Sequence, residues 1–225
     1  MKKFLLISFI IFTSCKINFT ADLYTSDLIE LAKSNNPEII LLPMEIEFQV
    51  ASCEDLNDEK RIMSTYFSDF EFLGCDINAE DFSSYAKAKV TAPVSNSNSI
   101  SNNLIGFHAY LSNDKEYVYV DAIINDASFK ELKNYVYEQT FQELKLSESK
   151  LIINLNNDLT DVTVWIMPSY VDSKPIAVET EFELQKRQKL IIETSNVSNS
   201  YLEEHFWTPI LSIVYKLFIK NTTLT

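Results

Sequence analysis

The residues best suited to acid–base chemistry in this sequence are a histidine and an aspartate in neighbouring apolar segments. His108 lies within residues 104–111 (LIGFHAYL), and Asp121 lies within residues 117–124 (YVYVDAII), with SNDKE between them. Two such segments around a short polar connection predict a β-hairpin. In that hairpin the two side chains could lie opposite each other as a general acid and base. No recognisable nucleophile accompanies them, so a cross-strand packing role is favoured over a hydrolase based on His108.

Two acidic segments superficially resemble calcium-binding loops. Residues 55–59 (DLNDE) and 76–80 (DINAE) each place several oxygen ligands close together. The sixth loop position, which needs glycine, holds Lys60 in one segment and Asp81 in the other, and neither segment has glutamate at the twelfth position. These carboxylates are therefore expected to lie in loops and at helix ends, with an adventitious Ca²⁺ site as the alternative.

The scarcity of glycine and histidine excludes several enzyme classes. The chain has two glycines, Gly74 and Gly106, so it cannot contain a dinucleotide-binding GxGxxG loop, a Walker A loop or a GxSxG nucleophile elbow. With two histidines, it cannot build a three-histidine zinc site within one chain. The sequence therefore predicts a non-enzymatic protein with no catalytic residue, no cofactor and no metal site.

The first sixteen residues, MKKFLLISFIIFTSCK, have the pattern of an export signal. Lys2 and Lys3 precede a largely apolar stretch of nine residues, 4–12, which is too short to span a membrane. The step from Phe12 through two small residues to Cys15 resembles the lipobox of bacterial lipoproteins, with Phe12 where leucine is usual. An ordinary signal peptide and a retained N-terminal anchor are the alternatives.

The lipobox resemblance implies a location. Residues 1–14 would be removed as a signal peptide, and Cys15 would carry acyl chains such as palmitate on its sulfur and its new amino group. Stable anchoring takes more than one acyl chain. Because Lys16 rather than aspartate follows Cys15, the resemblance implies the outer membrane of a Gram-negative host, facing the periplasm or the cell surface.

Lipidation of Cys15 would leave two cysteines, Cys53 and Cys75. An even pair in an oxidising compartment predicts a disulfide. The alternative is a reactive thiol, but neither cysteine belongs to a CxxC pair, and the adjacent Glu54 and Asp76 would disfavour a thiolate.

The charge of the chain disfavours nucleic acid as a partner. Loss of Lys2 and Lys3 with the leader would change the formal net charge from −13 to −15. Phosphates require a basic face, and anionic lipids would be repelled in the same way. The membrane contact would therefore depend on the lipid at Cys15.

Hydrophobic periodicity predicts a mixed α and β structure. Strands are expected at 38–50, 70–75, 84–94 and in the hairpin 104–124, and helices at 54–70 and 127–145. From residue 151 the pattern changes to short strands, which lie within 151–155, 161–171, 179–186 and 189–197. We therefore predict an α+β domain over 15–147, with an antiparallel sheet covered by two or three helices on one face. A smaller β-rich, sandwich-like domain would follow over 148–225.

The segment 206–220 (FWTPILSIVYKLFIK) is apolar on nearly every side. It is too short to span a membrane, and the acidic residues before it do not suit an interfacial helix. We expect it to lie in the core or in a partner-binding surface.

The whole chain resembles a group of uncharacterised bacterial or prophage-borne lipoproteins, through the leader, the Cys53/Cys75 spacing and the C-terminal run from LIINLNND to LIIETSNVS. The resemblance implies a location but no activity. We predict a lipid-anchored envelope protein that binds another protein or blocks a receptor. The alternative is a lipid-anchored carrier of a small apolar ligand.

Overall fold

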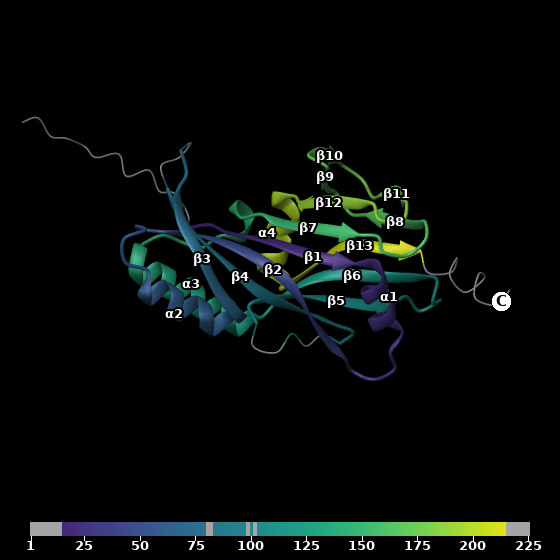
Figure 1. Ribbon diagram of the computed structural model, residues 1–225, viewed down its shortest axis with the longest axis horizontal. Helices are drawn as coiled ribbons and strands as arrows, with labels where there is room; N and C mark the ends of the chain where they lie inside the picture. The colour runs from purple at the N-terminus through teal and green to yellow at the C-terminus, as the bar shows by residue number, and fades with distance from the viewer. Residues whose placement is uncertain (1–14, 80–82, 98–99, 101–102, 215–225) are drawn as a thin grey trace, which may run out of the picture.

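The computed structural model describes residues 15–79, 83–97, 100 and 103–214 (Figure 1). The predicted signal peptide, residues 1–14, lies outside the described residues. The strands are β1 (Ile17–Tyr24), β2 (Ile39–Val50), β3 (Ser68–Ile77), β4 (Ser84–Ser95), β5 (Ile105–Leu111), β6 (Tyr117–Ile124), β7 (Leu151–Asn156), β8 (Val162–Ile166), β9 (Ser169–Val171), β10 (Lys174–Ile176), β11 (Thr180–Leu184), β12 (Lys189–Thr194) and β13 (Trp207–Val214). The helices are α1 (Thr25–Lys33), α2 (Asn57–Tyr66), α3 (Asp126–Thr140) and α4 (Asn196–His205), with a 3-10 turn, η1 (Leu146–Glu148).

All of these strands belong to one sheet that curls until its two edges approach each other. Its order is β10-β9-β12-β7-β1-β2-β4-β5-β6-β13-β8-β11, and β3 pairs with β4 outside this path. The two terminal strands, β10 and β11, are joined by residues 177–179 alone. Four peptide links span at most about 14 Å. The sheet is therefore nearly closed and encloses its own apolar face.

Strict alternation in the sequence explains which face is enclosed. In β1, Ile17, Phe19, Ala21 and Leu23 are buried, and the residues between them are partly exposed. In β2, the alternation predicted from Met44 to Val50 is confirmed: every second side chain is buried. Because successive strand residues point to opposite faces, this pattern places one apolar face inward on both strands.

The predicted α+β architecture is wrong. The described part of the chain is mostly β, with 49% of its residues in strands and 24% in helices. The strands after residue 148 do not build a separate sandwich-like unit, because β7 pairs with β1 and β13 pairs with β6. Strands from both sides of residue 147 thus complete the same wall. The apolar face that was expected to need a layer of helices is covered largely by the curvature of the sheet itself.

The helices close the two ends of this curved sheet. Strands β1, β4, β5 and β7 run in one direction, since β1 is parallel to β7, β4 is parallel to β5, and β2 is antiparallel to both β1 and β4. We call the end where β1 begins the Cys15 end. The opposite end, which carries the β5–β6 turn at residues 112–116, is the hairpin end. Helix α1 packs against β1, β5 and β6 near the hairpin end, whereas α2 and α3 lie together at the Cys15 end (Figure 1).

The predicted disulfide is confirmed. Cys53 and Cys75 are bonded, with their Cα atoms 5.6 Å apart, and the bond ties the segment before α2 to β3. The apolar segment 206–220 is also placed in part. Ile210, Leu211 and Ile213 of β13 are buried, which confirms a core role for this strand, and residues 215–220 lie outside the described residues. Among the helices of the described ranges, none has the length and apolar character to cross a membrane.

Candidate functional site

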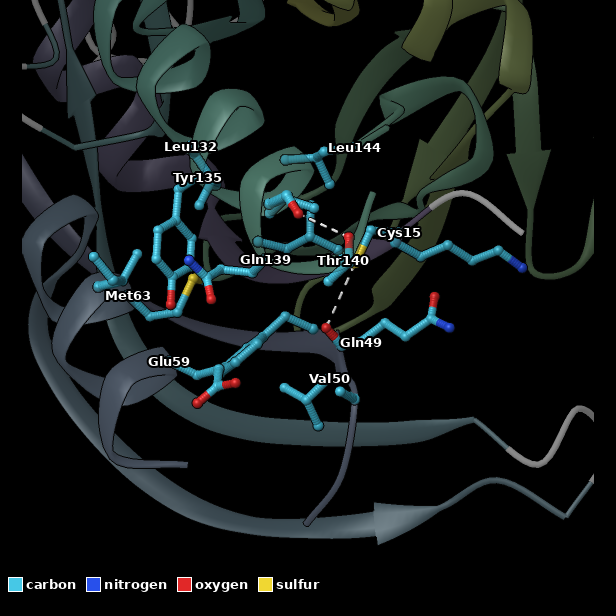
Figure 2. Close-up of a pocket in the computed structure, with 16 residues that line it drawn as sticks. Cys15, Gln49, Val50, Glu59, Met63, Leu132, Tyr135, Gln139, Thr140 and Leu144 are labelled. Atoms are coloured by element: carbon cyan, nitrogen blue, oxygen red, sulfur yellow. Dashed lines mark hydrogen bonds between the residues drawn. The ribbon is translucent and has the colours of Figure 1, made fainter. Parts of the chain in front are cut away.

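An apolar cavity of about 210 Å³ lies at the Cys15 end, between the inner face of the sheet and two helices (Figure 2). Its apolar wall includes Cys15 and Ile17 near the start of β1, Phe48 and Val50 of β2, Ile62 and Met63 of α2, and Leu132 and Val136 of α3. The polar side chains of Glu59, Tyr135 and Gln139 also border it. Figure 2 shows Cys15 near one end of the cavity and Met63 near the other.

Cys15 is held rigidly at this wall. Its residue is 6% exposed, its backbone N–H donates to the Glu143 carbonyl at 3.0 Å, and its Sγ lies 3.6 Å from the Gln49 carbonyl. Burial raises the pKa of the Cys15 thiol. Since the thiolate is the nucleophilic form, this environment disfavours a catalytic cysteine.

A second hollow also borders Cys15. Its lining includes Cys15, Ser84, Thr140 and Gln142. Cys15 therefore borders both the apolar cavity and this hollow.

The predicted pairing of His108 with Asp121 across the hairpin is confirmed, but the two side chains do not form a catalytic pair. The Asp121 carboxylate accepts a hydrogen bond from the Tyr110 hydroxyl, and His108 is hydrogen-bonded to the backbone of Asn96. The His108 ring stacks on Tyr110, with centroids 4.5 Å apart. Burial lowers the pKa of His108 and raises that of Asp121 to about 6. In both cases burial disfavours the charged form of the side chain, as expected of groups packed into a sheet.

Each acidic segment has one carboxylate in an ion pair. Asp58 lies 3.4 Å from Arg61, and Asp76 lies 3.3 Å from Lys87. Glu80 and Asp81 lie outside the described residues. Within the ranges that the structure covers, no group of three or more His, Cys, Asp or Glu residues is arranged to hold a metal ion.

Comparison with known proteins places this architecture in a family. Residues 17–218 match the family model described as Domain of unknown function (DUF7424). The chain belongs to the DUF7424 family. No curated protein matches the sequence. The DUF7424 match begins at the first residue of β1 and extends beyond β13, so it includes every strand of the nearly closed sheet.

The cavity of this DUF7424 domain could not be identified from the sequence. Leu132 and Val136 are spaced for one apolar face of the predicted helix at 127–145, and Met63 belongs to the apolar face of the predicted helix at 54–70. Such faces predict packing against a core. Whether two packed helices leave a space between them depends on their separation from the sheet, and periodicity carries no signal for that separation.

The burial of Asp121 predicts a pH-dependent stability. Its pKa of about 6 in the folded chain is above the ordinary value of 3.8, so folding favours the protonated form. The stabilising contribution is complete below about pH 4 and is lost as the pH rises through 6. The difference between these two pKa values corresponds to roughly 3 kcal/mol of stability, and partial solvation reduces this contribution to about 2 kcal/mol.

Asp121→Asn keeps a hydrogen-bond acceptor for the Tyr110 hydroxyl and removes the titratable carboxyl group. The free energy of unfolding is measured with urea at pH 4 and at pH 8. From pH 4 to pH 8, the wild type should lose about 2 kcal/mol more of this free energy than the variant does. An unchanged difference between the two proteins across this range would contradict the assignment of a raised pKa to Asp121.

Proposed function

We propose that this protein is a lipid-anchored envelope protein of non-enzymatic type that holds a small apolar ligand in the cavity beside Cys15. The observation that carries the proposal is the position of the cavity. Its wall includes the residue that the leader pattern marks for lipidation. The protein would be exported, cleaved before Cys15 and held at the outer membrane by its acyl chains, on the periplasmic or the surface side.

The size of the cavity limits the ligand. An engineered cavity of about 150 Å³ in another protein holds benzene, and pockets for drug-sized ligands measure about 300–1,000 Å³. A volume of about 210 Å³ lies between these values. The ligand class that fits is a single ring or a short acyl chain. Gln139 and Tyr135 at the border could orient a polar end group.

Filling the cavity tests this function. Val136 of α3 is half-buried and lines the cavity, whereas Asn134 of the same helix is exposed and does not. Toluene and octanoate serve as probes of the two ligand classes. A ligand that binds only the folded state raises its melting temperature. At least one probe should raise the melting temperature of the full-length wild type and of Asn134→Trp, and neither should raise that of Val136→Trp.

Two results would contradict the carrier function. One is a wild-type protein whose melting temperature neither probe changes. The other is a Val136→Trp protein that responds as strongly as the wild type. Cys15→Ser provides a further check, because a ligand-binding cavity that is independent of the anchor should still respond to the probe in that variant.

A protein-interaction role is the second candidate, and a cluster of exposed rings favours it. Tyr201 and Trp207 are 39% and 44% exposed, their ring centroids lie 5.6 Å apart, and His205 stacks against Tyr201 at 4.2 Å. Aromatic residues are enriched in protein interfaces. Chemical cross-linking in whole envelopes should capture a reproducible partner of the wild type but not of Tyr201→Ala. Tyr170→Ala changes an exposed tyrosine elsewhere, so this control variant should keep the partner. Recovery of the same partner from Tyr201→Ala would exclude this surface.

A further inference from the structure

Cys15 is joined to the folded body without a flexible spacer. Strand β1 begins at Ile17, two residues later, and the Ile17 N–H donates to the Ser149 hydroxyl at 3.2 Å. The Cys15 N–H is itself bonded to the Glu143 carbonyl. A flexible linker would allow the body to rotate freely above a membrane. A lipid attached to a residue that is part of the folded body instead holds the surrounding protein surface close to the bilayer.

The surface beside Cys15 carries large exposed apolar side chains. Phe141 follows α3 and is 78% exposed, and Tyr137, whose ring packs edge-on against Phe141 at 6.4 Å, is 54% exposed. Phe141 lies two residues before Glu143, the partner of the Cys15 N–H. Adjacent exposed apolar side chains are typical of surfaces that contact a partner or a membrane.

Local structure does not account for Phe141. It ends α3 in the left-handed conformation, with φ of 55°, and its N–H donates to the Tyr137 carbonyl. Glycine or asparagine ordinarily occupies this position, because a side chain there is strained. Neither the backbone conformation nor the core therefore accounts for an exposed phenylalanine at this position.

The opposite flank of Cys15 is also apolar. Ile77, at the end of β3, is 66% exposed and pairs with Ser84 of β4. Ser84 borders the same open hollow as Cys15 and Gln142. Exposed apolar side chains therefore flank the hollow that borders Cys15.

We infer that the Cys15 end rests directly on the lipid bilayer, with Phe141, Tyr137 and Ile77 in its interfacial layer. This inference rests on the proposed lipidation of Cys15. Aromatic side chains favour the membrane–water interface, where the ring leaves water and a hydroxyl such as that of Tyr137 stays hydrated. The nearby charges are mixed, with Lys145 between Glu143 and Glu148. The contact is therefore apolar rather than electrostatic, and the hairpin end points away from the membrane.

A label at each end of the sheet tests this orientation. Phe141→Cys places a thiol at the proposed contact. Asn113→Cys places one in the exposed β5–β6 turn, beyond strands about 26 Å long. In the lipidated chain the sulfur of Cys15 is blocked and Cys53 is bonded to Cys75, so each variant offers one reactive thiol. The full-length lipidated variants carry a nitroxide label and are reconstituted in phosphatidylethanolamine–phosphatidylglycerol vesicles.

The expected result is a ratio of oxygen to nickel-chelate collision rates that is several-fold higher at position 141 than at position 113, because oxygen partitions into lipid and the chelate stays in water. Suppose that the intact mass includes the acyl groups but the ratios at the two positions are equal. This result would overturn the inferred orientation without contradicting the lipidation of Cys15. An intact mass without acyl groups would overturn the proposed lipidation itself.

Discussion

Replacing Asn157 with alanine is expected to lower the free energy of unfolding by about 4 kcal/mol, the largest effect of a single substitution that we predict. Asn157 is 1% exposed and forms four side-chain hydrogen bonds. Its amide donates to the carbonyls of Thr160 and Leu184, both at 2.8 Å. Its oxygen accepts from the Thr25 hydroxyl at 2.9 Å and from the Leu159 N–H at 3.1 Å.

The size of this effect follows from what the bonds connect. They tie the start of α1, the turn after β7 and the end of β11 together at the hairpin end. Alanine would leave several buried donors and acceptors without partners, and each unsatisfied group costs about 1–3 kcal/mol. Water entering the site would recover part of this cost.

The neighbouring Asn156→Ala is the matched control for urea unfolding. Asn156 is half-buried, and its amide donates to Asn154 at 3.1 Å and to Leu23 at 3.4 Å. We expect a loss of about 1 kcal/mol there, because water can replace these bonds. Equal losses in the two variants would contradict the proposed role of the Asn157 network.

Removing the Cys53–Cys75 disulfide is expected to lower the free energy of unfolding by about 3 kcal/mol in the chain-entropy model. The two cysteines are 22 positions apart, and the double variant Cys53→Ser, Cys75→Ser opens the loop that contains α2. The measurement is urea unfolding of wild type and double variant, each with and without a thiol reductant. The reductant should destabilise the wild type to the level of the double variant and leave the double variant unchanged.

A double variant as stable as the wild type would show that the bond adds nothing beyond the packing of α2 and β3. A further loss of stability in the double variant on adding reductant would show that the effect does not come from this disulfide.

Local patterns in the sequence predicted most elements, because alternation and helical periodicity are local properties. The alternation from Met44 to Val50 and the helix at 127–145 both correspond to elements of the structure, β2 and α3. Helix α4 was missed. The segment KLIIETSNV predicts a strand throughout, but Ser195 accepts the Ser198 N–H and begins a helix there.

The architecture could not be predicted in the same way, because it depends on pairings between distant segments. Parallel pairing of β1 with β7 joins residues more than 130 positions apart. Nothing in the composition of either strand selects the other, since each shows the same alternation. Asn156, Asn157 and Asp158 are typical turn residues. The burial of Asn157 among three segments follows only from the closed shape of the sheet.

The central claim is that acyl chains on Cys15 hold this folded body at a membrane. Intact mass spectrometry of the membrane fraction, combined with thiol titration, tests it most directly, in the wild type and in Cys15→Ser. We expect a wild-type chain that begins at Cys15, carries the mass of its acyl groups and has no titratable thiol. We expect Cys15→Ser to lack the acyl mass. Recovery of the wild type as an uncleaved chain in the soluble fraction, with three titratable thiols, would contradict it.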